Sequence, residues 1–247
     1  GKHLVHKRFR EGVMAYLSEL YEGESDEAKE ARKFIRETSD FQGALKCMPR
    51  YLGFELAMLN SLAKDGDYQK ALFTLPRNLR LMFIHAYQSY LFNLILSKRI
   101  GAGTGIIMPQ PGDSVCYPES DGFPDTKRVQ KVKDSTLEGI TRLARFNRAF
   151  VTLPIIGFET ELSGGVQGEL EREVMGTEGV TFEDFRSEIK EFNSSGNVRP
   201  ARIVMASLPT TKVEEDENRV GKVKVELSFV LPKGSYATTL LREYMKC

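Results

Sequence analysis

The sequence contains no tryptophan, three cysteines and three histidines among its 247 residues. The cysteines show no paired spacing, which favours free thiols in a reducing, cytoplasmic compartment over a disulfide framework. No histidine lies near a cysteine at metal-ligand spacing, so a zinc site is not expected. No apolar run approaches the roughly 20 residues that cross a bilayer. We therefore expect a cytoplasmic protein without metal or membrane anchor.

The composition that remains is ordinary for a globular protein, with 41% hydrophobic and 28% charged residues and a net charge of +1. The charge is uneven, because residues 219–247 carry six cationic side chains against two acidic ones. Directly before them, Glu214-Glu215-Asp216-Glu217 is typical of an exposed turn. The chain does not begin with methionine, and we expect it to be part of a longer protein.

Apolar residues at spacings of three and four predict helices over 4–21, 26–37 and 51–64, with Ser25 as the N-cap of the second. The strongest helical pattern runs from Pro76 to Gly101, and apolar side chains around most of its axis predict burial. We expect further helices at about 135–147, 166–175 and 182–192.

Three polar residues of the 76–101 helix form one stripe. Arg77, Gln88 and Arg99 are each eleven residues apart, about three helical turns. Such a stripe can pair with carboxylates, extend toward solvent or contact phosphates. Structural pairing is the favoured interpretation, with direct RNA contact as the alternative.

Strands are predicted at Phe150–Gly157 and Arg202–Ala206, and most clearly at 222–231, where valine, leucine and phenylalanine alternate with polar residues. Pro232-Lys233-Gly234 ends the last strand, and a closing helix follows at about 235–244. The mixture indicates an α/β or α+β fold without a regular βαβ rhythm.

Residues 75–93, LPRNLRLMFIHAYQSYLFN, resemble the signature helix of the TruD family of tRNA pseudouridine synthases. Residues 229–243, FVLPKGSYATTLLRE, are similar nearly letter for letter to its C-terminal Leu-Pro-x-Gly-Ser-aromatic-Ala-Thr…Arg-Glu motif, in wording that looks more archaeal than bacterial. Weaker similarities at Gly112-Asp113 and Leu153–Gly157 occur in the family's order.

The resemblance implies a fold and an activity. The fold would be α/β (α+β): a TruD insertion domain over 1–208, then the C-terminal strand and helix of a mixed-sheet catalytic core over 209–247. The enzyme would be an isomerase that converts a tRNA uridine, expected at position 13 in the D-arm region, to pseudouridine without a cofactor. Its expected partners are tRNA and the N-terminal half of the same protein. The alternative is a non-catalytic RNA-binding or interaction module.

The family's nucleophile is an aspartate in a Lys-Asp-[Arg or Lys]…Thr segment. Lys64-Asp65-Gly66-Asp67 and Lys133-Asp134-Ser135-Thr136 are superficially similar. Neither precedes the other motifs in the family's order. We therefore expect no catalytic residue in this chain, a nucleophilic aspartate upstream of it, and no activity from the chain alone.

The C-terminal motif implies a substrate-binding role for Tyr236, because this aromatic lies in the family's active-site cleft and could support a flipped uridine. Gly234 and Ser235 would shape the turn that presents the ring. Packing of Tyr236 under the sheet is the structural alternative. Arg242 and Glu243 would either orient the site's carboxylate network or pair on the closing helix. The other possible supporting residues are Arg77, Gln88, Arg99 and Lys233.

Overall fold

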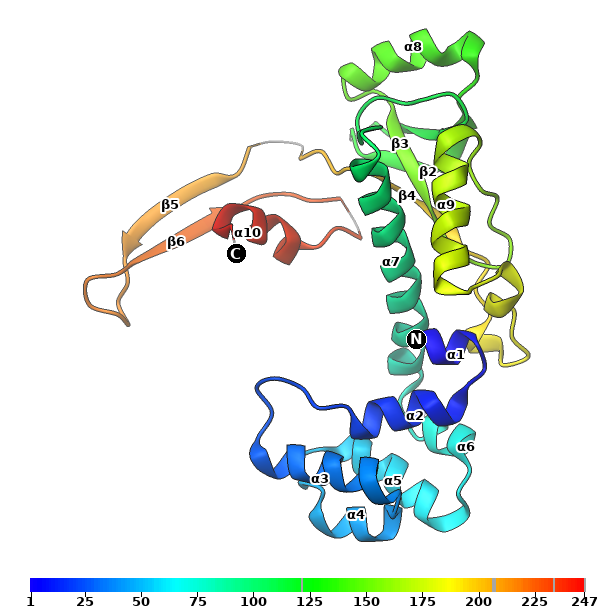
Figure 1. Ribbon diagram of the computed structural model, residues 1–247. Helices are drawn as coiled ribbons and strands as arrows, with labels where there is room; N and C mark the ends of the chain where they lie inside the picture. The colour runs from blue at the N-terminus through cyan, green and yellow to red at the C-terminus, as the bar shows by residue number, and fades with distance from the viewer. Residues whose placement is uncertain (121, 206–207, 233, 247) are drawn as a thin grey trace. The chain divides into compact units, whose positions relative to one another are not determined.

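The computed structural model describes residues 1–120, 122–205, 208–232 and 234–246. Its helices and strands (Figure 1) fall into two compact units, and their mixture confirms the expected α+β class. Unit 1 comprises Gly1–Ile95, Pro154–Glu161 and Arg172–Asn197. Unit 2 comprises Leu96–Leu153, Leu162–Glu171 and Val198–Cys247.

Unit 1 opens with six helices: α1 (Lys2–Val5), α2 (Phe9–Ser18), α3 (Asp26–Thr38), α4 (Phe41–Cys47), α5 (Gly53–Asp65) and α6 (Tyr68–Phe73). The expectation of one helix over 4–21 is wrong. Lys7 has a left-handed φ of 59° and separates α1 from α2, while the Arg8 N–H closes the turn on the carbonyl of His3. The expected helices α3 and α5 are confirmed, and Ser25 Oγ caps α3 by accepting a hydrogen bond from Ala28 N at 3.2 Å.

The core of these helices is apolar, with one buried charge cluster. Val13, Leu17 and Ile35 are fully buried. Arg32 is also buried among them, and its guanidinium bonds Glu24, Glu55 at 2.9 Å and two backbone carbonyls. A buried guanidinium is tolerated only where its donors find acceptors, and here the acceptors come from α2, α5 and the loop between α2 and α3. Helical periodicity alone gave no sign of this cluster.

Helix α7 (Arg77–Gly101) follows the predicted bounds closely. Its apolar side chains Ile84, Leu91 and Ile95 are buried, as the pattern predicts. Gly101, where the predicted pattern ends, is still helical, and the left-handed residue that follows the helix is Gly103, with a φ of 72°.

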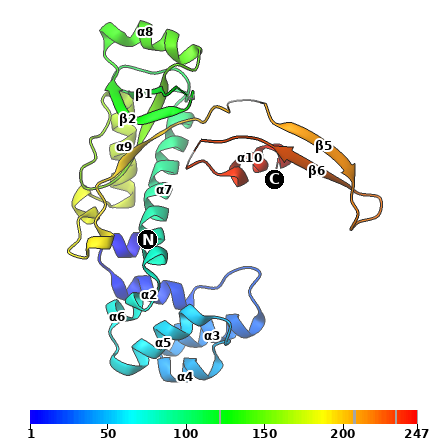
Figure 2. The same cartoon turned by 180° about the vertical axis from the view of Figure 1, so that it is seen from behind.

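A four-stranded sheet, most of which belongs to unit 2, has the order β2-β1-β3-β4. It is formed by β1 (Ser114–Pro118) and β2 (Pro124–Lys131), which are labelled in Figure 2, and by β3 (Phe150–Ile155) and β4 (Asn197–Pro200). β1 pairs antiparallel with both β2 and β3, and Val115 lies opposite Val151. The prediction of β3 is confirmed, whereas β2 was not anticipated because its neighbourhood is rich in glycine, proline and aspartate.

The strand expected at Arg202–Ala206 is wrong over its described residues, 202–205. The chain follows the sheet only as far as Ala201, whose N–H bonds the carbonyl of Val151. The Arg202 side chain then bonds Ala144 O and Asn147 Oδ1 at the end of α8 (Asp134–Arg145). Ala206 lies outside the described residues.

Helix α9 (Gly165–Glu178) extends the prediction for 166–175. The single helix expected over 182–192 is wrong, because the structure has two short 3-10 helices, η1 (Phe182–Phe185) and η2 (Lys190–Phe192). Side chains of Ser187 and Asn193 accept hydrogen bonds from backbone N–H groups between them, which competes with a continuous helix. A capping interaction is present at the start of η1, where Thr181 N donates to Asp184 Oδ2 at 2.7 Å.

A buried polar network, the Arg99 network, organises unit 2. The Arg99 guanidinium donates to both carboxylate oxygens of Asp113 (2.8 and 2.7 Å), to Gln167 Oε1 (2.8 Å) and to the Gly105 carbonyl (2.7 Å). Gln167 then donates to Glu171, which also accepts the Ser163 N–H at 2.7 Å. The Arg99 and Asp113 side chains are each only 1% exposed, so neither charge has water as an alternative partner.

Removing one member of this buried pair should strongly lower the stability of the protein. We expect Asp113→Ala to lower the free energy of unfolding by about 3–5 kcal/mol, because it leaves a buried guanidinium without its counter-ion. The double variant Arg99→Met/Asp113→Leu should lose less of the unfolding free energy, since no unpaired charge remains. Arg77→Met on the same helix is the control, with an expected loss below about 1 kcal/mol, because the Arg77 side chain is exposed and Glu191 keeps its pair with Arg80. Urea denaturation measures all three, and a loss below about 1 kcal/mol for Asp113→Ala would contradict the assignment.

Glu171 predicts a pH dependence of stability. Burial raises the pKa of its carboxyl above the ordinary value of 4.5. The folded state therefore retains a proton that the unfolded chain has already released, so this contribution is complete below the ordinary pKa and is lost as pH rises through the raised one. We expect Glu171→Gln, which cannot titrate, to flatten the pH dependence of the unfolding free energy above about pH 4.5. An unchanged profile would show that Glu171 titrates normally.

Candidate active-site segment

The C-terminal segment, residues 208–232 and 234–246, contains β5 (Thr210–Glu215), β6 (Val223–Ser228) and α10 (Ala237–Met245). β5 and β6 form an antiparallel two-stranded sheet in which Val213 lies opposite Val225. The expected last strand and closing helix are confirmed within shorter bounds. The acidic run was expected to be a turn, but Glu214 and Glu215 belong to β5 and only Asp216 and Glu217 follow it.

No residue of the C-terminal segment, in the ranges just given, is buried. The alternation of apolar and polar residues over 222–231 predicts one covered face for this strand. This is wrong for the chain as it stands, since Val223 and Val225 are 64% and 55% exposed. Two strands alone cannot bury a face. Other large apolar side chains of the segment are exposed as well: Leu208, Val213, Val220, Val230, Tyr236, Tyr244 and Met245.

A tight turn presents Tyr236 at the start of α10. Gly234 has a φ of 82°, a conformation that side chains with a Cβ disfavour, and Ser235 N donates to the Pro232 carbonyl at 3.2 Å. Tyr236 occupies the N-cap position, where its carbonyl accepts the Leu240 N–H, and its side chain is 62% exposed. The geometry thus leaves the ring free for a ligand or for another part of the protein.

The neighbouring supporting residues behave differently from each other. Glu243 accepts a hydrogen bond from Lys246 Nζ at 3.1 Å. Glu243 is therefore paired with Lys246 at the end of the closing helix. A role of Arg242 and Glu243 in orienting the carboxylates of the site stays a prediction. The Arg242 side chain is exposed. Lys233 lies outside the described residues.

The stripe on α7 has three environments. Arg77 is exposed and lies 3.4 Å from Glu191. Gln88 is buried, and its Nε2 donates to the Ile156 carbonyl at 2.6 Å and to Ser194 Oγ at 2.8 Å. Arg99 belongs to the Arg99 network. The donors of Gln88 and Arg99 are thus engaged within the protein, which matches the structural interpretation rather than contact with RNA.

The two aspartates in nucleophile-like sequences lie on the surface at helix ends. Asp65 is the last residue of α5 rather than a turn residue; a hydrogen bond from Asp67 N and the nearby Lys70 lower its pKa. Asp134 is the first residue of α8 and is exposed. Neither has the burial or the neighbouring groups that would distinguish a nucleophile.

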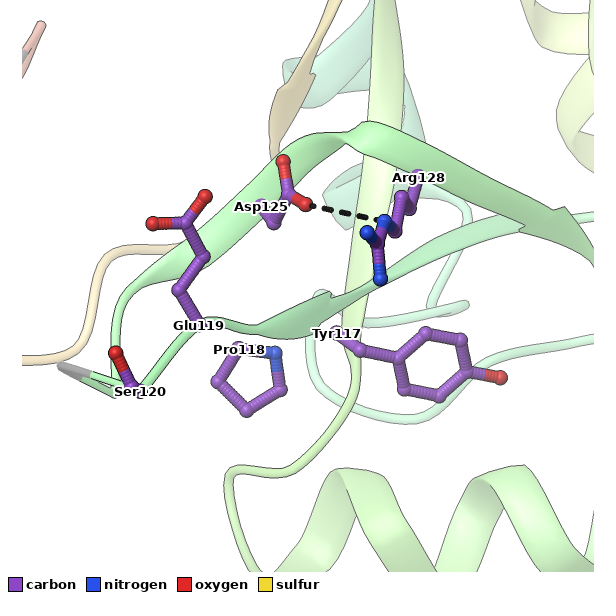
Figure 3. A pocket seen from close by; sticks show the side chains of 6 residues that line it. All are labelled: Tyr117, Pro118, Glu119, Ser120, Asp125 and Arg128. Atoms are coloured by element: carbon purple, nitrogen blue, oxygen red, sulfur yellow. Dashed lines mark ion pairs between the residues drawn. The ribbon is translucent and has the colours of Figure 1, made fainter.

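Each unit has a hollow on its surface. One of about 380 Å³ lies at the end of the β1–β2 hairpin (Figure 3), where Arg128 Nε is 4.0 Å from Asp125 Oδ2. The other, of about 630 Å³, lies in unit 1 beside Cys47, Arg50 and Asn60. Neither is lined by a residue of the two long sequence motifs.

Two further properties bear on function. Across the described ranges, histidine, cysteine and acidic side chains nowhere gather in threes in a way that could hold a metal ion. None of the helices described combines the length and the apolar character needed to span a bilayer.

Comparison with known proteins identifies the family. The family described as tRNA pseudouridine synthase D (TruD) matches residues 1–244. A protein of Methanosarcina acetivorans named probable tRNA pseudouridine synthase D is 43% identical over all of this chain and 56% of its own length. One from Archaeoglobus fulgidus with the same name is 31% identical over all of this chain and 57% of its own. A TruD crystal structure from Methanosarcina mazei superposes with a TM-score of 0.88 at 42% identity, covering all of this chain and 56% of that one.

The chain belongs to the TruD family. The resemblance expected from the signature helix and the C-terminal motif is confirmed. These relatives are archaeal, as the sequence of the C-terminal motif indicates. The chain spans about half the length of the curated relatives it matches.

Tyr236 can be tested as a substrate surface. In the full-length protein we expect Tyr236→Ala to reduce single-turnover rate by about ten- to a hundredfold, since stacking of a base on an aromatic ring is worth about 1–3 kcal/mol. Tyr236→Phe should be mild, because the ring face is retained. The thermal midpoint should change little in both. A core tyrosine would behave differently: Tyr236→Ala would cost about 3–5 kcal/mol of stability, and its remaining folded fraction would turn over normally.

Proposed function

We propose that the full-length protein is a tRNA pseudouridine synthase of the cytoplasm, an isomerase that converts a uridine at position 13, in the D-arm region, to pseudouridine. The observation that carries the proposal is the match of the TruD family to residues 1–244, together with a crystal structure of the same family that superposes on the whole chain. The C-terminal motif around Tyr236 lies within the matched range.

The chemistry is an isomerisation, so no atom is gained or lost. The bond between ribose C1′ and uracil N1 breaks, the base turns over, and C1′ bonds to C5, which then loses its proton while N1 gains one. An aspartate would act on the nucleotide, with proton transfers completing the exchange. The target base must leave its stack first, and Tyr236 would support it. This scheme requires neither a metal nor a redox cofactor.

We place the nucleophilic aspartate in the part of the protein outside this chain. Residues 1–208 would form the family's insertion domain, and residues 209–247 would complete the catalytic core. The exposed apolar side chains of the C-terminal segment support this division, because β5, β6 and α10 need a surface to cover them. The N-terminal half of the same protein is the proposed partner, and tRNA would bind to the assembled protein through phosphates and shape.

The second candidate is a non-catalytic RNA-binding or interaction module. The surface positions of Asp65 and Asp134 favour it for the chain in isolation, since neither offers a credible nucleophile. The two candidates differ in what the full-length protein does to tRNA, so one activity measurement separates them.

The test compares the full-length protein with this chain on unmodified tRNA, with pseudouridine read by mass spectrometry. We expect product from the full-length protein and none from the chain. Asp65→Asn and Asp134→Asn in the full-length protein should leave the yield unchanged. Product from the isolated chain that disappears in either variant would overturn the placement of the nucleophile, and no product from the full-length protein would favour the non-catalytic module.

A further inference from the structure

The segment from β2 to the residues just after α8 is strongly cationic in a nearly neutral protein. Residues 124–148 carry seven lysines and arginines against three acidic residues, a local excess of four, whereas the whole chain has a net charge of +1. The cations on β2 have a structural explanation, because β2 is an edge strand and charged side chains protect such edges from pairing with other chains. The cations at the end of α8 need a different explanation, because they do not lie on an edge strand.

The last turn of α8 and the residues after it present a patch of three arginines and one aromatic ring. The patch comprises Arg142, Arg145, Phe146 and Arg148, and we call it the α8 patch. All four are exposed, and Phe146 is 73% exposed. Among the described residues, the three arginine side chains have no carboxylate within ion-pair distance.

The helix dipole explains only part of this arrangement. Cations in a last helical turn are favourable, which accounts for Arg142 and Arg145. Arg148 lies beyond the helix, and Phe146 gains nothing from the dipole. The buried side of α8 is formed by Ile140 and Ala144, so the patch belongs to the opposite, solvent-facing side and does not contribute to the core.

The cap that follows α8 fixes the patch in place. Asn147 has a left-handed φ of 56°, and Arg148 N donates to the Leu143 carbonyl at 2.9 Å, which closes the helix end. Arg202 then locks this cap, donating to Asn147 Oδ1 at 2.8 Å and to the Ala144 carbonyl at 3.3 Å. Arg202 itself is held over the Phe150 ring, 5.4 Å from its centroid. A rigid backbone therefore presents the neighbouring Phe146 and Arg148.

We infer that the α8 patch binds the backbone of folded tRNA, with the arginines on phosphates and Phe146 stacked on an unpaired base or ribose. Guanidinium groups are suited to phosphate oxygens, and an exposed ring between cations is the surface that unpaired nucleotides use. This inference deepens the proposed function, on which it rests for the identity of the RNA. It assigns to unit 2 an RNA contact separate from the substrate role proposed for Tyr236.

The test uses the full-length protein and three variants. Arg142→Gln/Arg145→Gln/Arg148→Gln removes the charge of the patch. Arg10→Gln/Lys64→Gln/Lys190→Gln is the matched control, because it removes the same charge from exposed positions of unit 1. Phe146→Ala removes the ring alone. Dissociation constants for unmodified tRNA are measured from 0.05 to 0.3 M salt, after thermal unfolding has shown that each variant is folded.

Each phosphate contact contributes about 0.7–0.9 to the slope of log affinity against log salt. We expect the patch variant to lose about 2 from that slope and to bind about a hundredfold more weakly at 0.1 M salt, and the control to change less than about threefold. Phe146→Ala should bind about tenfold more weakly with the slope unchanged. Equal slopes for the patch variant and the control, or an unaffected Phe146→Ala, would overturn the inference.

The outcome is distinguishable from failure of the proposed function. A wild-type protein that makes no pseudouridine but binds tRNA through the α8 patch would reject the proposed activity and support this inference. A wild-type protein that makes pseudouridine, together with a patch variant that binds tRNA like the control, would support the proposed activity and reject this inference.

Discussion

The buried ion pair between Arg99 and Asp113 is the interaction on which unit 2 depends. Removing a guanidinium and a carboxylate from water costs several kcal/mol for each ion, and only excellent geometry offsets that cost. The geometry here is a two-pronged pair at 2.8 and 2.7 Å, completed by Gln167 and the Gly105 carbonyl. The acceptors come from the loop after α7, the residue before β1, and α9.

The same network reaches the sheet through the backbone. The Asp113 carbonyl accepts the Val132 N–H, and the Gly112 N–H donates to the Val132 carbonyl, both at 2.8 Å. Thus the residue that neutralises Arg99 also pairs its main chain with the residue that follows β2. Charge pairing and strand pairing at this corner are coupled, which explains why a Gly-Asp pair, otherwise typical of a loop, occurs there. Glycine suits position 112 for a second reason: its φ is 90°, and a Cβ would meet the backbone of Gly164.

The C-terminal segment differs from the Arg99 network, because none of its described residues is buried. An amphipathic strand and helix gain stability only when their apolar sides leave water, and a two-stranded sheet is marginal without further packing. A chain that covers 56% of its relatives and leaves these side chains exposed is consistent with a core completed by residues from the rest of the protein. The family motif at Tyr236 lies in this uncovered segment. Its chemistry would then depend on contacts that the chain cannot make alone.

The sequence predicted the elements whose signal is local. Helix α7, strand β3 and the cap at Ser25 follow from periodicity and side-chain chemistry within a few residues. The break at Lys7 and the edge strand β2 did not follow, since a left-handed lysine and a polar edge strand are decided by tertiary contacts. The α7 stripe shows the same limit: a spacing of eleven places three residues on one side of a helix, but neighbouring elements decide that Arg77 faces solvent while Gln88 and Arg99 are buried. For the candidate site, motif similarity led to Tyr236 and Gly234, while the partners of Glu243 and Arg99 needed the fold.

The net charge of the chain also does not show which cationic segment can attract an RNA backbone, and the reason is physical. At physiological ionic strength, charges separated by more than about 8 Å are largely screened, so a phosphate responds to the nearest side chains and not to the total of +1. The C-terminal cations that the sequence brings to notice are partly neutralised, since Lys224 lies 2.8 Å from Glu217 and Lys246 lies 3.1 Å from Glu243. The arginines of the α8 patch have no such partner among the described residues. Local pairing, which only the fold determines, therefore decides which of two cationic segments offers the stronger field to an RNA backbone.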